Sequence, residues 1–257
     1  MTTSQPQHVG KPQGVDQPQG GAFAQSTCRA LDGDDDRRNY HGYQHRLIAP
    51  HVGRSLLEIG AGTGALSARF GDRERLVVTD VDPEAVAHLQ QRFAGRPEVT
   101  VRSFDLASGA VLDDPVDTAI AVNVLEHSPD DAGALRALAR SVRPGGTLVL
   151  FVPGYQQLYG DFDRKVGHVR RYTPATLRGA VDRAGLSVRV CHPVNLLGGL
   201  AWWAAVRKGG TGSPRPRMVR AYDRTVVPAT RLIETLVRRP PFGQSIFCVA
   251  RVPSDAA

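Results

Sequence analysis

The segment with the clearest chemical potential is a glycine-rich turn that follows an apolar run. The run Leu56-Leu57-Glu58-Ile59 leads into Gly60-Ala61-Gly62-Thr63-Gly64, so glycines occupy alternate positions. Glycine adopts positive φ easily and lets a ligand approach the backbone, which predicts a buried strand, a tight turn and the start of a helix. The N–H groups at such a helix start can face a polar or anionic group.

Two kinds of cofactor use such a turn, and Glu58 separates them. Residues 60–65 also match the dinucleotide pattern G-x-G-x-x-A, so a nicotinamide- or flavin-dependent enzyme is one interpretation. A pyrophosphate gains nothing from an acid two residues before the first glycine. By contrast, the amino group and the sulfonium of S-adenosylmethionine (SAM) are cations. With its acid and its glycines, the segment resembles motif I of the class I SAM-dependent methyltransferases.

Three further polar residues follow predicted strands. Asp80 ends a strand over 75–80, in the position where an acid accepts hydrogen bonds from ribose hydroxyls. Asp105 follows a strand over 99–104 and can accept from the adenine amino group, although a surface turn would also suit it. Asn123 follows a strand over 116–122. Because ligands bind at the carboxyl ends of parallel strands, these side chains should converge on one crevice.

The order and spacing of these segments, together with 123–127 and 142–148, are similar to those of class I methyltransferases over about residues 40–190. The resemblance implies an α/β, Rossmann-like fold, in which a seven-stranded, mostly parallel sheet has helices on both faces and an antiparallel last strand. It implies SAM as the cofactor. The residues that it places around SAM are Tyr40, Glu58, Gly60, Ala61, Gly62, Gly64, Asp80, Val81, Asp105, Leu106 and Asn123.

A later segment, from 151–153 through 158–160 to 167–173, resembles a bacterial methyltransferase-11/12-like subgroup associated with glycosyltransferases and with envelope or natural-product pathways. An imidazole here can take a proton near neutral pH, and two arginines can hold a carboxylate or a phosphate. The candidate catalytic residues are His168, His127 and Tyr172. The candidate substrate contacts are Tyr159, Arg170 and Arg171.

Each of these assignments has a structural alternative. His127 can be a packing or helix-capping residue, and the two arginines can pair with Asp161 and Asp163. Two carboxylates in one loop are little support for a divalent ion, so no metal is expected.

Composition divides the chain into three parts. Residues 1–36 are rich in Gln, Gly, Pro, Thr and Ser and predict a disordered tail. Residues 37–194 and 244–253 form the predicted methyltransferase domain. Residues 195–243 interrupt it before the last strand and predict a helical cap, whose role is a lid, a homodimer interface or a peripheral membrane contact through 195–240.

The charge indicates an anionic partner. The net charge is +7, and residues 164–251 hold 17 Lys and Arg against 3 Asp and Glu. A small-molecule or lipid-linked anionic acceptor fits this excess, whereas no nucleic-acid module accompanies it. Three scattered cysteines and the lack of an N-terminal apolar region predict a cytoplasmic protein, with a peripheral position at the inner membrane surface as the alternative.

The sequence therefore predicts a SAM-dependent methyltransferase that acts on an O, N or C nucleophile. The alternatives are a catalytically silent SAM-binding partner protein and, less favoured because of Glu58, a nicotinamide-dependent oxidoreductase.

Overall fold

The computed structural model describes residues 37–106, 108–204, 216–237 and 239–254. The predicted tail over 1–36 lies outside these ranges.

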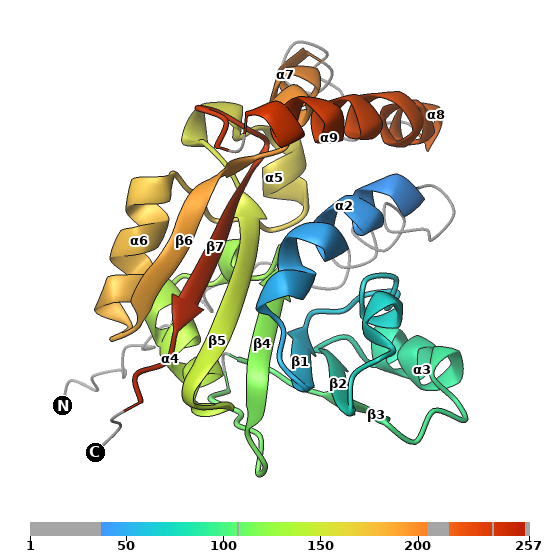
Figure 1. Cartoon of the computed structure of the whole chain (residues 1–257), viewed down its shortest axis with the longest axis vertical. Coiled ribbons are helices and arrows are strands. Elements are labelled where there is room, and N and C mark those ends of the chain that lie inside the picture. Colours follow the sequence, from blue (N-terminus) through green and yellow to red (C-terminus); the bar gives the residue numbers. More distant parts are fainter. Residues whose placement is uncertain (1–36, 107, 205–215, 238, 255–257) are drawn as a thin grey trace, which may run out of the picture.

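A single twisted sheet forms the centre of the molecule (Figure 1). Its seven strands run in the order β3-β2-β1-β4-β5-β7-β6, and β7 is antiparallel to both of its neighbours. This arrangement confirms the predicted seven-stranded, mostly parallel sheet with an antiparallel last strand. The strands are β1 (Ser55–Ile59), β2 (Arg75–Asp80), β3 (Val99–Ser103), β4 (Val116–Val122), β5 (Val142–Pro153), β6 (Ser187–Val194) and β7 (Ser245–Arg251).

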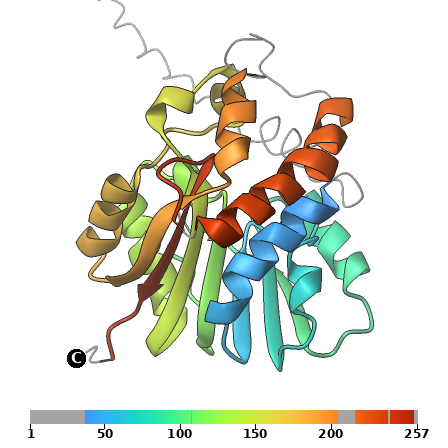
Figure 2. The same cartoon turned by 45° about the horizontal axis from the view of Figure 1, so that its top comes forward.

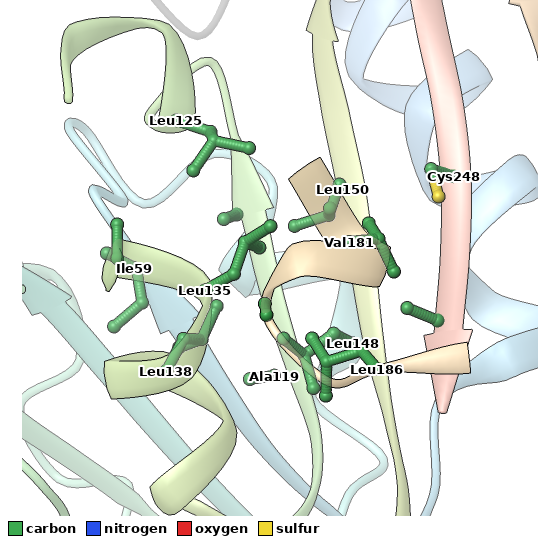
Figure 3. Packing of buried hydrophobic residues seen from close by; sticks show 14 of the residues in the cluster. Ile59, Ala119, Leu125, Leu135, Leu138, Leu148, Leu150, Val181, Leu186 and Cys248 are labelled. Carbon is green, nitrogen blue, oxygen red and sulfur yellow. The ribbon is translucent and has the colours of Figure 1, made fainter. Parts of the chain in front are cut away.

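Alternation along the strands produces a separate core on each face of the sheet. Leu57 and Ile59 of β1 belong to one buried cluster, while Leu56 belongs to the other. The first face packs against α4 (Asp131–Arg140) and α6 (Pro174–Arg183), as Figure 3 shows for Leu135, Leu138 and Val181. The second face packs against α2 (Arg38–Ile48) and α3 (Pro83–Arg92). Each fully buried leucine contributes about 1.5–3 kcal/mol through apolar burial.

The α-helix predicted directly after the glycine turn is wrong. The chain instead makes a series of turns and one short 3-10 helix, η3 (Ser67–Phe70). Gly60, Gly62 and Gly64 all have positive φ, between 57° and 75°, so a right-handed helix cannot begin before residue 65.

The inserted segment before β7 is helical and packs on α2 (Figure 2). It contains α7 (Leu196–Trp202), α8 (Pro216–Ala221), a π-helical turn η7 (Tyr222–Val226) and α9 (Val227–Leu236). The buried carboxylate of Asp223 accepts hydrogen bonds from the backbone N–H groups of Asn39 (3.0 Å) and Tyr40 (2.8 Å) at the start of α2. The Tyr43 hydroxyl donates to Glu234 (2.6 Å). These long-range bonds fix the inserted helices against α2.

Within the described ranges, none of the helices combines the length and the apolar character that a membrane crossing requires.

Candidate active site

A cavity of about 890 Å³ lies at the carboxyl ends of the parallel strands. It is lined by α2, by the turns after β1, β2, β3 and β4, by the segment after β5 and by the inserted helices. The strand-end residues Gly60, Asp80, Asp105 and Asn123 all line it. The other predicted cofactor contacts on its wall are Tyr40, Glu58, Ala61, Gly62, Val81 and Leu106.

Two backbone hydrogen bonds hold the Asp80 carboxylate at the cavity wall. The Gly62 N–H donates to Asp80 Oδ2 (2.9 Å), and the Asp82 N–H donates to Asp80 Oδ1 (3.0 Å). The residue that caps the N-terminus of α3 is Asp82, whose side chain accepts a hydrogen bond from the Glu84 N–H (2.9 Å). Asp80 is therefore positioned by the glycine turn and does not cap the helix.

Glu58 lies in the middle of the sheet and is only 3% exposed. Its carboxylate accepts a hydrogen bond from the Ser67 hydroxyl of η3. Its backbone carbonyl accepts from the Thr79 hydroxyl (2.8 Å), which ties the ends of β1 and β2 together. Glu58, the residue that favours SAM over a dinucleotide in the sequence, therefore lies on the cavity wall next to the glycine turn.

The glycines of the turn serve different purposes. A Cβ on Gly60 would lie 2.8 Å from Cγ2 of Val124, a residue of the turn that follows β4. A Cβ on Gly64 would lie 2.7 Å from Leu89 Cδ2 and 2.9 Å from Phe93 Cε2. Gly64 therefore lets α3 pack closely against the turn. The sequence predicted that Gly64 contacts the cofactor, but this residue does not line the cavity.

The variant Gly64→Ala is expected to lower the free energy of unfolding by about 2–5 kcal/mol. About 1–2 kcal/mol comes from the positive φ of 75° and about 1–3 kcal/mol from overpacking against Leu89. Gly95→Ala is the matched control, because Gly95 has a φ of 79° but no heavy atom near the added Cβ. Urea denaturation of both variants measures the difference. If both variants lost the same free energy of unfolding, the packing role of Gly64 would be contradicted.

A second group of side chains surrounds His168, which is buried on the cavity wall. His168 Nδ1 lies 2.8 Å from Asp163 Oδ1, and the Nε of Arg171 donates to the same oxygen at 2.8 Å. Burial alone would raise the pKa of Asp163, but the bonds from His168 and Arg171 outweigh it and lower that pKa. Asp163 is therefore a charged anchor for both residues.

Glu126 completes this group from the turn after β4. Its side chain is 0% exposed, and neither carboxylate oxygen makes a hydrogen bond within the described part of the chain. Oε1 lies 3.6 Å from His168 Nε2. Burial raises the pKa of Glu126 to about 7, although the nearby His168 opposes this.

His127 also lines the cavity. Its ring centroid lies 4.8 Å from that of His168, in an edge-on arrangement. Loss of bulk water around the ring, together with the nearby His168, lowers the pKa of His127 to about 4. The His127 ring is therefore neutral at pH 7.

Aromatic side chains cover this end of the cavity. The rings of Phe162 and Trp202 lie 5.0 Å apart, edge to face, and the Arg171 guanidinium lies 5.3 Å from the centre of the Trp202 ring. The Tyr159 hydroxyl donates to the His168 carbonyl (2.7 Å). Trp202 belongs to α7, so the inserted segment supplies part of the wall.

The structure does not bring Tyr172 and Arg170 to the cavity. Tyr172 is buried among core residues, with its hydroxyl 3.4 Å from Asp131 Oδ2, and burial raises its pKa well above the usual range. Arg170 donates to the same Asp131 oxygen (3.0 Å) and to the Pro129 carbonyl (2.6 Å). The structure therefore places these two predicted residues against the start of α4 and not on the cavity wall.

Sequence reasoning also missed several residues on the wall of the cavity. No motif marks them, because they come from separate loops and from the inserted helices. They are Arg37, Phe162, Arg164, Trp202 and Gln244.

Comparisons with known proteins identify the family. A model of a methyltransferase domain matches residues 57–148. A protein of Mycobacterium tuberculosis named as an uncharacterized methyltransferase is 30% identical over 201 residues, which cover 73% of this chain and 76% of that protein. The chain belongs to the class I SAM-dependent methyltransferases. A Mycobacterium bovis protein of the same printed description is 29% identical over 198 residues, with the same shares covered.

Solved structures agree on the fold of this methyltransferase. The N-methyltransferase NodS from Bradyrhizobium japonicum, in complex with S-adenosyl-L-homocysteine, superposes with a TM-score of 0.56 at 17% identity and covers 90% of this chain and 98% of that one. The [4+2]-cyclase SpnF gives a TM-score of 0.56 at 21% identity, covering 83% and 81%. Because a [4+2]-cyclase shares the fold, the fold alone does not define the reaction.

Proposed function

We propose that this methyltransferase moves the methyl group of SAM to an O, N or C nucleophile of a small-molecule or lipid-linked acceptor that carries an anionic group. The observation that supports this is the chemical difference between the two ends of one cavity. One end is built from glycines and acids, and the other from histidines and aromatic rings. A volume of about 890 Å³ is near the top of the usual range for ligand pockets, which leaves room for two molecules.

The residues at the first end fit SAM. The fixed carboxylate of Asp80 would accept from the ribose hydroxyls, and Asp105 from the adenine amino group. Val81 and Leu106 would flank the adenine, and Glu58 would hold the cationic amino-acid end. When bound, SAM supplies an electrophilic methyl group, and the task of the protein is to align it with the nucleophile.

The second end fits an acceptor that loses a proton. The Asp163 carboxylate can accept from the N–H at His168 Nδ1 (2.8 Å) and so fix the ring; in the neutral imidazole Nε2 then carries the lone pair. We assign His168 to the proton transfer and leave Asp163 as the residue that orients it. Phe162 and Trp202 would cover the apolar part of the acceptor and exclude water.

Arg164 is the best placed cation for the anionic group. It lines the cavity, and its partner Asp161 is an exposed neighbour on the same short helix, α5 (Asp161–Lys165). Exposed ion pairs of this kind contribute only about 0.2–1 kcal/mol, so an acceptor can replace Asp161. Arg171, which the sequence favoured, is instead buried against Asp163.

Transfer of tritium from [methyl-³H]SAM tests the proposed function. The full chain is incubated with sets of phosphorylated, carboxylated and neutral small molecules and with lipid-linked phosphates. Labelled anionic products are expected. SAM binding without transfer to any set would instead support a catalytically silent partner protein, and labelling of neutral acceptors alone would remove the anionic group from the proposal.

We further propose that the outer face of the inserted helices contacts an anionic membrane surface. Leu232 and Leu236 lie one turn apart on α9 and are 69% and 82% exposed. Arg217, Arg220 and Arg224 recur every three or four residues, which places them along one side of α8 and η7. Helices that lie in a membrane interface typically combine exposed apolar side chains with basic ones.

Leu232→Ser combined with Leu236→Ser is expected to reduce binding to phosphatidylglycerol-containing vesicles at least tenfold in a sedimentation assay. The loss comes from two apolar side chains, each worth about 1.5–3 kcal/mol when buried. Ala229→Ser, on an exposed position of the same helix, is the control. No sedimentation of the unmodified chain with these vesicles, or equal sedimentation of the double variant, would contradict the contact.

A further inference from the structure

The group formed by Glu126, His127 and His168 has the composition of a metal site. One donor atom from each of the three side chains lies within 4.8 Å of the others. From this geometry we propose that these residues bind one divalent transition-metal ion, which in turn binds an oxygen of the acceptor. The inference rests on the proposed function but changes the role of His168, whose Nε2 here binds the ion and does not itself accept the proton. It also departs from the sequence-based expectation of no metal.

The strongest support is the state of Glu126. A carboxylate that is 0% exposed and makes no hydrogen bond with the described residues is costly to keep charged. Oε1 faces His168 Nε2 at 3.6 Å, and in the neutral imidazole, with its proton on Nδ1 toward Asp163, that nitrogen carries a lone pair. Two electron-pair donors that face each other need a cation or a proton between them.

The spacing of the donors is close to that of a formed site. With metal–ligand bonds of about 2.1 Å, two adjacent ligands lie about 3.0–3.5 Å apart. The 3.6 Å between Glu126 Oε1 and His168 Nε2 is already near this range. His127 also lines the cavity, and its donor atom lies within 4.8 Å of the other two.

Both imidazoles have the supporting partners that metal-bound histidines use. His168 is oriented by the Asp163 carboxylate at 2.8 Å, and Asp163 is held by Arg171. His127 is hydrogen-bonded to the backbone of Gly167. Such contacts fix the ring orientation and leave the other nitrogen available for the ion.

The donor set also indicates the class of ion and its use. Two imidazoles and one carboxylate suit Mn²⁺, Fe²⁺ or Zn²⁺ better than Mg²⁺ or Ca²⁺, which prefer oxygen ligands. Three protein ligands leave coordination positions open toward the cavity. A hydroxyl oxygen bound there loses its proton to solvent more easily. That oxygen then forms its bond to the methyl carbon as the carbon–sulfur bond breaks and S-adenosyl-L-homocysteine leaves.

Titration of the metal-free full chain with Mn²⁺, followed by the electron paramagnetic resonance signal of free Mn²⁺, tests the site without SAM or acceptor. One ion per chain is expected. Glu126→Gln and His168→Gln should each weaken binding at least tenfold. His88→Gln, which removes an exposed histidine of α3, is the matched control and should leave the affinity unchanged.

Folding is checked by the thermal midpoint without metal. Glu126→Gln removes a buried carboxylate that makes no hydrogen bond with the described residues, so its midpoint should equal or exceed that of the unmodified chain. Added Mn²⁺ should raise only the midpoint of the unmodified chain. Equal Mn²⁺ affinities of the unmodified chain and Glu126→Gln would show that a proton alone lies between the two side chains and would overturn the site. A calorimetric SAM titration of the same samples separates this outcome from failure of the proposed function.

Discussion

Asp80→Ala is expected to weaken SAM binding between about ten- and a hundredfold. The carboxylate is fixed at the cavity wall by the Gly62 and Asp82 N–H groups, and charge-assisted hydrogen bonds to a ligand contribute about 1.5–3 kcal/mol. Because about 1.4 kcal/mol corresponds to a factor of ten, the loss of these bonds gives the stated range. Isothermal titration calorimetry with SAM measures the dissociation constant.

Two variants separate this contact from general effects. Asp80→Asn keeps the shape and one acceptor oxygen, so its affinity should lie between those of the unmodified chain and Asp80→Ala. Asp113→Ala removes an exposed loop carboxylate outside the cavity and should bind SAM normally. An unchanged dissociation constant for Asp80→Ala would show that the ribose assignment is wrong.

His168→Ala should slow methyl transfer at least a hundredfold while SAM affinity changes less than twofold. A positioned group that assists proton removal contributes about a hundred- to ten-thousandfold to a rate. The imidazole is oriented by Asp163 in the segment after β5, whereas Asp80 ends β2, and β1 and β4 lie between these two strands, so removal of the imidazole should spare SAM. The turnover number with an acceptor found by the tritium assay, and a parallel calorimetric titration, provide the two readouts.

His88→Ala is the control, since this exposed histidine lies on α3 outside the cavity. If His168→Ala turned over at the rate of the unmodified chain, His168 would have no part in the chemistry. If it lost SAM binding to the same extent as turnover, its role would be structural.

The cofactor end of the cavity could be predicted from the sequence because its residues occupy the ends of consecutive strands. Once the sheet is parallel, Glu58, Asp80, Asp105 and Asn123 must meet at one edge. Gly64 shows the limit of the pattern. The motif identified three glycines but did not distinguish the one that packs against α3 from those that face the ligand.

The acceptor end could not be predicted in the same way. After β5 the chain is irregular, so neither a period of two nor one of 3.6 residues determines which side chains point inward. His168 and Arg171 line the cavity, while Arg170 and Tyr172 contact Asp131 at the start of α4. Trp202 reaches the wall only through long-range packing of the inserted helices.

The most direct test of the central claim is calorimetric titration of the unmodified chain with SAM, alongside NADH. The cavity with Glu58 and Asp80 on its wall predicts one SAM per chain and no heat of binding from NADH. Binding of NADH without SAM, or binding of neither, would contradict the assignment of this cavity to a cationic methyl donor.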